Sequence, residues 1–498
     1  MTTTPRTLAL WVACVAQLLV VLDISVVNVA LPSIQSALGM SPTRASWVAL
    51  AYGLGFAGAL LVGARLADVV GTGRVLLWGL AAFTLASTVG GLATEGWVLI
   101  GARAAQGLCA AVVSPATFTL LTTTHPEGPD RTRAIAAWTA VSLAGGGVGT
   151  TLGGVLTELV SWRAVLLVNL PVGVTVLAGA AVLHRRSPSA PGRGRLDLVG
   201  AVLATGAFTC ATYALSAAGG DANALAAGSA AITSAALFLL LGGQQRRAAH
   251  RLVPRGLLRN RSVVWGNLAT ALTAACFQVG LWYFLTYRMQ GSMDFTPIQA
   301  GLGFLPLTLA MLVVNTWVTP RLMTGVPPRT LVVLGAATAA LGLVWQAFAG
   351  GGSYVVTVLG PSTVIGVGGG LLNTPLATMV TTGVAADEAG AASGLMNTAK
   401  QFGGALGLAA ATAATTLAGT DRAAFLLMGG LVGTVAAAVL VSLRSRQRDR
   451  RRTAAPDRLA GDAVSSAVTR MRTREPAPHR VRSIRRRRVR RTRRSGRP

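Results

Sequence analysis

Charged residues are scarce in this chain of 498 residues. Asp, Glu, Lys and Arg together make up 12% of the sequence, whereas 52% of it is hydrophobic. Soluble globular domains usually carry about 25% charged residues. The scarcity of charge therefore excludes an ordinary soluble globular protein and indicates a chain whose main solvent is a lipid bilayer.

Histidine and cysteine are rare as well, and their placement excludes several kinds of site. The 4 histidines lie in predicted loops or in the C-terminal tail, and the 4 cysteines stand singly with no CxxC spacing. Neither pattern forms a metal site or a disulfide framework, so we interpret the cysteines as small core residues. No nucleophile and base pair is visible. We expect no cofactor and no enzymatic activity.

Long apolar runs are abundant. Windows of about 20 mostly apolar residues, the length that crosses a bilayer, occur fourteen times between residues 8 and 443. The first window, 8–31, could imitate a signal peptide, but no small-residue cleavage site follows it, and we interpret it as an uncleaved helix. The sequence predicts an all-α polytopic membrane protein with 14 transmembrane helices. A twelve-helix fold in which residues 197–242 are re-entrant is the alternative.

The distribution of arginine supports the same topology. With the N-terminus inside, the inner segments before the tail hold 17 arginines, while the outer loops hold Arg44, Arg163, Arg288 and Arg422. Positive charge accumulates in short cytoplasmic loops. The arginine-rich, nearly lysine-free composition suggests a GC-rich bacterial genome. We therefore expect a multi-pass protein of the bacterial cytoplasmic (inner) membrane with both termini in the cytoplasm.

Loop lengths divide the chain into four parts. Two loops, at 184–197 and 242–262, are longer, polar and basic, and they bracket one helix pair. Two six-helix bundles around such a centre are the plan of many transporters. The predicted parts are an N-terminal six-helix bundle (1–188), two linker transmembrane helices (189–245), a C-terminal six-helix bundle (246–443) and an Arg-rich tail (444–498).

The tail carries most of the net charge. From Arg444 onward it contains 21 arginines and 4 acidic residues, which is 21 − 4 = +17 of the formal net charge of +28. We expect a disordered cytoplasmic segment that repels itself and rests near anionic lipid headgroups. A role in nucleic-acid binding is the alternative, but the tail has no aromatic or folded partner that would support it.

Charged side chains inside predicted spans are candidates for function. Asp23 is the one acidic residue well inside a span, where a charge costs about 2.5 to 3.5 kcal/mol. Arg103 in the fourth window keeps its proton and must be paired or hydrogen-bonded. A rise of about 1.5 Å per residue places Asp23 and Arg103 at similar depth in the outer half. We hypothesise that Asp23 carries protons beside Arg103. A static buried pair that only fixes helix packing is the alternative.

The span that carries Asp23, the span that carries Arg103 and two later stretches resemble the major facilitator superfamily, and within it the fourteen-helix drug:proton antiporters. The stretch "LDISVVNVALPSI" is similar to the first-helix signature of the family, with Asp23 at its aspartate. The stretch "LIGARAAQGLCAA" matches the fourth-helix pattern through Arg103, Gln106 and Gly107. "SWRAVLLVNLPVG" and "AASGLMNTAKQFGGALG" also resemble family stretches at the same relative positions. The resemblance covers about residues 8–443.

Two further motifs depart from the family pattern. The stretch "ARLADVVGTGR" keeps Asp68 and Gly71 of the family's loop between helices two and three, with Arg74 one place late. The resemblance implies that these three residues act in gating. In the fifth helix Thr150 stands where the family has proline. Glycines at helical spacing let a helix bend or pack closely, and the family's glycine pattern is met by Gly145, Gly149, Gly153 and Gly154.

The resemblance implies proton-coupled efflux of a hydrophobic or amphipathic drug or antibiotic by alternating access, with the proton gradient as the energy source. Such a protein confers resistance or exports a self-made antibiotic, and we expect a monomer. An uncoupled facilitator or channel for a small metabolite is the alternative, and a membrane enzyme or receptor is a third. We expect a substrate pathway lined by polar residues of the spans, namely Asn28, Gln106, Gln278, Asn373 and Lys400.

Overall fold

The computed structural model describes residues 5–126, 129–186, 197–218, 224–248, 255–350, 352–384 and 389–440. These residues are almost entirely helical, and no strand occurs among them. The predicted all-α class is therefore confirmed for this part of the chain. The Arg-rich tail predicted at 444–498 lies outside the described residues.

The first half of the described chain contains nine helices. They are α1 (Pro5–Ala37), α2 (Pro42–Val70), α3 (Thr72–Gly91), α4 (Gly96–Thr124), α5 (Pro129–Leu159), α6 (Trp162–Leu167), α7 (Asn169–Arg186), α8 (Leu198–Ala218) and α9 (Ala224–Arg247).

Shorter helices and π-helical turns break up several elements of the second half. Its elements are α10 (Arg255–Arg259), α11 (Arg261–Phe277), α12 (Gly280–Tyr287), η1 (Arg288–Ser292), α13 (Pro297–Gly303), α14 (Leu305–Val313), η2 (Val314–Val318), α15 (Thr319–Leu322), α16 (Pro328–Phe348), η3 (Val355–Leu359), α17 (Gly360–Thr381), α18 (Ala389–Ala418) and a last helix, Arg422–Leu440.

Two glycine turns mark the two ends of α2. Gly39, between α1 and α2, has φ +58°, and Gly71, between α2 and α3, has φ +96°. Side chains other than glycine rarely adopt this left-handed region, so both positions favour glycine. The Ser41 side chain then caps α2 by accepting a hydrogen bond from the Arg44 backbone N–H. The two ends of the bundle are named below the Gly39 end and the Gly71 end.

Twelve helical stretches of the described residues are long and apolar enough to cross a membrane. Helices α2 and α18 are not among the twelve, although they are 29 and 30 residues long. The count of fourteen spans therefore stays a prediction. Helices α8 and α9 are both among the twelve, and this argues against a re-entrant segment at 197–242.

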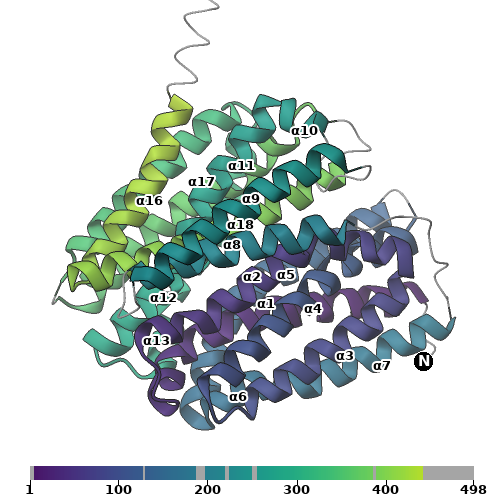
Figure 1. Ribbon diagram of the computed structural model, residues 1–498, viewed down its shortest axis with the longest axis horizontal. Coiled ribbons are helices and arrows are strands. Elements are labelled where there is room, and N and C mark those ends of the chain that lie inside the picture. Colours follow the sequence, from purple (N-terminus) through teal and green to yellow (C-terminus); the bar gives the residue numbers. More distant parts are fainter. Residues whose placement is uncertain are drawn as a thin grey trace, which may run out of the picture. The chain divides into compact units, whose positions relative to one another are not determined.

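The helices pack in two groups. In the first group α1 contacts α4, α5 and α7, and α3 contacts α4 and α7. Their buried apolar core includes Leu19, Leu80, Phe83 and Leu121. In the second group α17 contacts α11, α14 and α16, and α11 contacts α18. Figure 1 shows the first group in purple to blue and the second in teal to yellow-green. The exact division into bundles at 1–188 and 246–443 stays a prediction.

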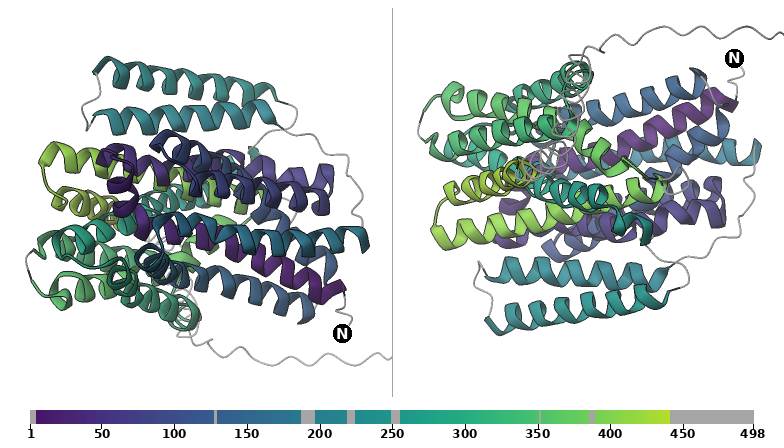
Figure 2. Two further views of the ribbon diagram at one scale, coloured as in Figure 1. Left: turned by 90° about the horizontal axis from the view of Figure 1, so that it is seen from below. Right: turned by 90° about the horizontal axis from the view of Figure 1, so that it is seen from above.

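Helices α8 and α9 form a pair of their own. They run side by side along the outside of the other helices (Figure 2), and α8 contacts α2 and α18. At one end of the pair the Asp197 carboxylate accepts hydrogen bonds from Gln244 Nε2 at 2.9 Å and Gln245 Nε2 at 2.7 Å. These contacts tie the start of α8 to the end of α9.

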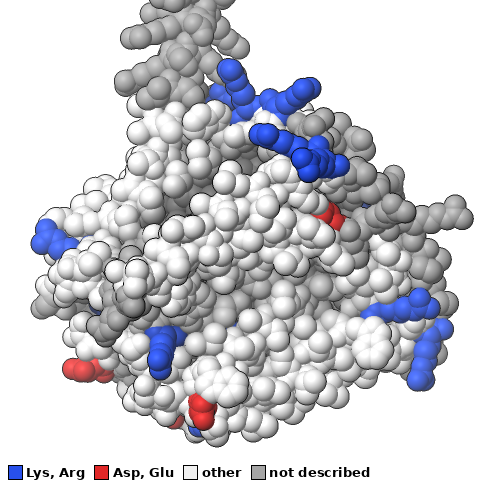
Figure 3. Space-filling model, in the orientation of Figure 1, with Lys and Arg blue, Asp and Glu red and all other residues white. Residues whose placement is uncertain are grey.

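The surface of the helices is largely apolar. Leu225, Ile232 and Leu239 of α9 are each more than 70% exposed, which fits a helix whose outer face contacts lipid tails. Most of the face drawn in Figure 3 carries no described charged side chain, and the blue and red side chains lie mainly towards its edges. This distribution suits a bilayer, since charge is tolerated where the lipid headgroups and water lie.

Candidate functional site

The Asp23 carboxylate is the centre of a buried polar network. Asp23 lies near the middle of α1 and is 0% exposed. Its Oδ2 accepts a hydrogen bond from Arg103 Nη1 at 2.5 Å, and its Oδ1 accepts from Gln106 Nε2 at 2.9 Å and from Asn169 Nδ2 at 2.7 Å. The structure thus brings Asp23 and Arg103 together as an ion pair. Their depth in the outer half of a membrane stays a prediction.

Arg103 is held from several directions and is 1% exposed. Its Nε donates to the Val48 carbonyl oxygen at 3.2 Å, and its Nη1 also donates to Gln106 Oε1 at 3.1 Å. The guanidinium carbon lies 4.4 Å from the centroid of the Tyr52 ring, a geometry that attracts a cation to the ring face. A buried ion pair needs such additional hydrogen bonds to offset the loss of water, and α2 supplies part of them.

Asn169 belongs to the network and was not singled out by the sequence reasoning. It is the first residue of α7, directly after the break that separates α7 from α6, and it is 0% exposed. Its Nδ2 lies within hydrogen-bond distance of Asp23 Oδ1 and also of Ser87 Oγ, at 3.0 Å. Ser87 Oγ in turn donates to the Leu166 carbonyl oxygen at 2.8 Å. A signal was present, because Asn169 is the polar residue in the apolar run "VLLVNLPVG".

The four glycines predicted to bend α5 lie at close contacts with neighbouring helices. A Cβ on Gly153 would stand 2.6 Å from the Val26 carbonyl oxygen of α1, and one on Gly154 would stand 2.3 Å from the Pro297 carbonyl oxygen of α13. Gly145 and Gly149 also face α1. Because α5 runs without a break from Pro129 to Leu159, these contacts support close packing, and a bend stays a prediction.

The predicted gating residues lie at the Gly71 end. Gly71 joins α2 to α3 with φ +96°, and its N–H donates to the Ala67 carbonyl oxygen. Arg74 is exposed on the first turn of α3. Asp68 lies in α2, but its side chain is outside what the structure describes. Their pairing in a gate therefore stays a prediction.

The residues predicted to line the substrate pathway lie partly in the first group of helices and partly in the second. Gln106 is part of the Asp23 network, and Asn28, five positions further along α1, is buried with 5% exposure. In the second group of helices, Lys400 Nζ of α18 lies 3.3 Å from Asn373 Oδ1 of α17. Gln278, at the end of α11, lies beside α18, because a Cβ on Gly404 would stand 2.7 Å from Gln278 Cβ.

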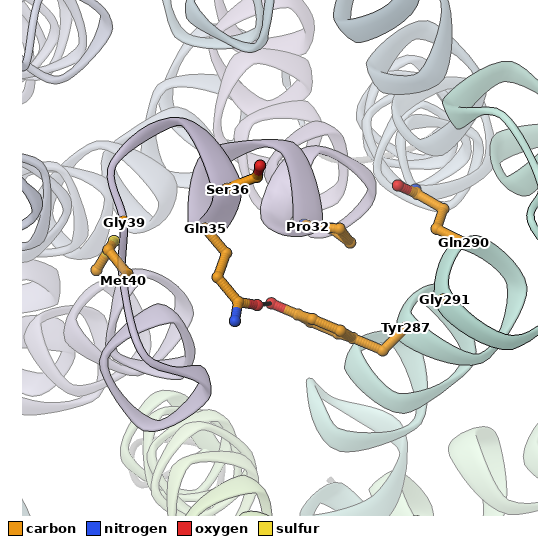
Figure 4. A pocket seen from close by; sticks show the side chains of 8 residues that line it. All are labelled: Pro32, Gln35, Ser36, Gly39, Met40, Tyr287, Gln290 and Gly291. Atoms are coloured by element: carbon orange, nitrogen blue, oxygen red, sulfur yellow. Dashed lines mark hydrogen bonds between the residues drawn. The ribbon is translucent and has the colours of Figure 1, made fainter.

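The two groups of helices also touch at the Gly39 end. Tyr287 Oη of α12 donates to Gln35 Oε1 of α1 at 2.5 Å, and Gln290 Nε2 of η1 donates to the Val29 carbonyl oxygen at 2.8 Å. Figure 4 shows the Tyr287 ring pointing across the interface towards Gln35. The contact borders a pocket of about 450 Å³, whose lining includes Pro32, Gln35, Met40, Tyr287, Gln290 and Gly291.

A second contact at this end joins α5 to α13. Glu158 Oε2 accepts a hydrogen bond from the Ile298 backbone N–H at 2.9 Å. One turn before Glu158, Gly154 lies against the Pro297 carbonyl oxygen. At the Gly39 end, α1 and α5 thus contact the elements from α12 to α13.

Similar proteins are found over most of the chain. Residues 13–408 match the family model described as Major Facilitator Superfamily. The cephamycin export protein of Amycolatopsis lactamdurans is 50% identical over 411 residues, which cover 82% of this chain and 84% of that protein. The puromycin resistance protein of Streptomyces alboniger is 39% identical, covering 79% of this chain and 78% of that protein. The lincomycin resistance protein of Streptomyces lincolnensis is 32% identical, covering 79% and 81%.

Solved structures with the same fold are more distant in sequence. A crystal structure of a peptide transporter, POT, in complex with sulfate has a TM-score of 0.67 and 14% identity, covering 88% of this chain and 94% of that chain. At this identity the likeness shows the fold alone. Taken with the match of the family model over residues 13–408, it fits a membrane protein with many apolar helices. The chain belongs to the major facilitator superfamily and is a transporter, not an enzyme.

Proposed function

We propose that this transporter exports an antibiotic in exchange for protons by alternating access. The observation that carries the proposal is the buried Asp23 carboxylate, which accepts hydrogen bonds from side chains of α4 and α7. Antibiotic as substrate is supported by the relatives named for cephamycin export and for resistance to puromycin and lincomycin.

Protonation of Asp23 supplies a physical basis for coupling. The ionised carboxylate attracts the Arg103 guanidinium and accepts from the amides of Gln106 and Asn169. A protonated carboxyl has no net charge for Arg103 and replaces one acceptor position with a donor. The two protonation states therefore differ in how they hold α4 and α7 against α1. A proton shifts a conformational equilibrium only through such a difference between states.

The access states follow from the contacts at the two ends. We infer that the Gly39 end faces the outside, as the arginine distribution predicts, and that the Tyr287–Gln35 and Glu158–Ile298 contacts close it in this structure. Export would open these contacts while the Gly71 end closes. Asp68, Gly71 and Arg74 are the proposed gating residues there, and the glycines of α5 are the proposed site of bending or sliding.

Location and partners complete the proposal. The transporter lies in the cytoplasmic membrane of a bacterium with both termini in the cytoplasm, and it works as a monomer of two six-helix bundles joined by α8 and α9. The Arg-rich tail rests on anionic lipid. The proton gradient is the energy source, and no cofactor takes part.

A susceptibility panel in a pump-deficient bacterial host tests the proposal. Cells expressing the wild-type chain are compared with cells expressing Asp23→Asn at matched membrane levels, because this variant keeps the size of the side chain but cannot titrate. We expect the wild type to raise the inhibitory concentration of at least one antibiotic and the variant to lose that protection. Protection that is equal in both strains would favour uncoupled transport, and the lack of any protection would contradict export.

A further inference from the structure

Lys400, which is partly buried, differs from the two buried arginines Arg103 and Arg288. Arg103 is paired with Asp23, and Arg288 is paired with Asp421 at 2.7 Å. Lys400 forms no ion pair among the described residues, and its hydrogen-bond partner there is the neutral amide oxygen of Asn373. The interior charges that the structure describes therefore leave one positive charge, on the single lysine of the sequence, without a compensating anion.

The surroundings of Lys400 are polar but neutral. Lys400 lies in the middle third of α18, far from both helix ends. One turn further on, Gly404 packs against the side chain of Gln278, so the end of α11 approaches the same stretch of α18. Beside Asn373, Thr374 Oγ1 donates to Asn315 Oδ1 at 3.1 Å. The Asn373 amide of α17 therefore contacts Lys400, and the Gln278 side chain at the end of α11 lies one turn further along α18. Neither amide can neutralise the cation.

A charge at this depth is costly unless a counter-ion accompanies it for part of the cycle. We propose that Lys400, with Asn373 and Gln278, binds a carboxylate of the exported antibiotic. An ammonium group binds a carboxylate by a charge-assisted hydrogen bond, roughly twice as strong as a neutral one. The amide of Gln278 or Asn373 can donate a second hydrogen bond to the same group.

This inference rests on the proposed export of antibiotics and narrows it to acidic ones. Two of the relatives are named for cephamycin and for puromycin. By their chemical structures the cephamycin nucleus carries a carboxylate, whereas puromycin carries an amine and no carboxylate. An interior with one uncompensated positive charge suits the acid and repels the amine. The substrate class assigned to this chain is therefore an amphipathic antibiotic with a free carboxylate.

The test uses the full chain in proteoliposomes and three compounds, namely a cephamycin with a free carboxylate, its neutral methyl ester and puromycin. Transport of each is measured for the wild type, Lys400→Gln and Lys400→Arg. Arg422→Gln is the matched control, because it also removes one positive charge but at an exposed position near a helix start. Competition between the acid and its ester for binding to the wild-type protein is measured in parallel, without a proton gradient.

We expect Lys400→Gln to raise the KM for the acid by about tenfold or more and to leave the KM for the ester within about twofold, since a hydrogen bond to a charged group supports such a difference. Lys400→Arg and Arg422→Gln should stay close to the wild type for all three compounds. The wild type should bind the acid at least about tenfold more tightly than the ester.

Several outcomes would overturn the inference. Equal losses for acid and ester in Lys400→Gln would mean that Lys400 supports the fold, and an unchanged KM for the acid would mean that it does not touch the carboxylate. If Lys400→Gln fails to insert, the competition in the wild type decides, and tighter binding of the ester contradicts the inference. Export of ester and puromycin without export of the acid would leave the proposed function standing and refute the carboxylate site. If none of a wider antibiotic panel is exported, both fail.

Discussion

Asp23 and Arg103 stabilise each other at a depth where neither would be tolerated alone. The pair is supported by Gln106, Asn169 and the Tyr52 ring, so most of the hydrogen-bonding capacity of both groups is used inside the protein. Replacing one partner of a buried pair leaves the other charge uncompensated, which typically costs about 3 to 5 kcal/mol. In Asp23→Asn, Arg103 keeps the Val48 carbonyl oxygen, the Gln106 amide oxygen and the Tyr52 ring, and the new amide oxygen can accept from the guanidinium. Without Arg103, the Asp23 carboxylate keeps no cation. We therefore expect Asp23→Asn to cost less folding free energy than Arg103→Ala.

Arg103→Ala should lower the amount of folded protein in the membrane and its melting temperature, because it leaves the Asp23 carboxylate buried without a cation. The expected loss is about 3 to 5 kcal/mol of folding free energy. Membrane levels and thermal unfolding in detergent are the measurements, and exposed Arg422→Ala is the control. The double variant with Asp23→Asn should recover part of the loss. Full stability of Arg103→Ala alone would show that the ion pair adds nothing.

Asn169→Ala should insert normally and reduce antibiotic-driven proton movement by about tenfold, since it removes one of three donors to the Asp23 carboxylate and one hydrogen bond is worth about that factor. Ser87→Ala is the graded control, because Ser87 contacts Asn169 and not the carboxylate. It should have a smaller effect. Equal effects of the two variants, or none, would remove Asn169 from the coupling site.

Sequence reasoning reached Asp23 and Arg103 for a clear physical reason. A charge inside an apolar span is conspicuous, and helix rise gives its depth. The sequence did not predict the role of Asn169, because neutral amides occur in many spans. Its contact with the Asp23 carboxylate depends on its position at the start of α7, directly after the break from α6. The sequence also could not predict that Lys400 contacts Asn373, because this contact depends on how α17 and α18 are rotated about their axes.

At the scale of elements, α5 is one of the helices that connect the two groups. One of its faces packs on α1 through Gly149 and Gly153, and Gly154 approaches α13 so closely that a Cβ would collide with the Pro297 carbonyl oxygen. The sequence contains glycines at these positions, and their helical spacing predicted either a bend or close packing of α5. The sequence alone does not distinguish these two roles, because glycines at helical spacing permit both.

Gly154→Ala should therefore weaken the closure of the Gly39 end. Spin labels at Ser36 and Ser292, both exposed at this end, report the separation of the two groups in a cysteine-free background. We expect the variant to increase the population of longer distances, because α13 must move away from α5. Gly146→Ala on the same helix is the matched control, since a Cβ there meets nothing within 4 Å. Identical distance distributions in both variants would contradict this account of α5.

At the scale of the whole molecule, composition and arginine placement were sufficient to predict an all-α protein with many spans. The family model over residues 13–408 and the twelve long apolar helices agree with that prediction. The sequence did not predict the contacts between the two groups at the Gly39 end, because they depend on how α1 and α5 meet α12 and α13 in three dimensions. In the proposed cycle they belong to one of two access states.

The arginine distribution makes a direct topological prediction. Reporter fusions or cysteine tags at positions 126 and 190 should report the cytoplasm, and tags at 95 and 221 should report the outside. The tag at 221 also tests the pair of α8 and α9, since a re-entrant segment would abolish its outside signal. A swap between the two sets of positions would refute the orientation proposed for both ends of the molecule.

Antibiotic-induced proton movement in vesicles with an imposed pH gradient tests the central claim most directly. The wild-type chain is compared with Asp23→Asn at equal membrane levels, and a pH-sensitive dye reports protons as the antibiotic is added. We predict that the wild type moves protons on addition of the antibiotic, whereas Asp23→Asn still binds it but moves none. Proton movement at the wild-type rate in Asp23→Asn would mean that the carboxylate is structural and that coupling resides elsewhere.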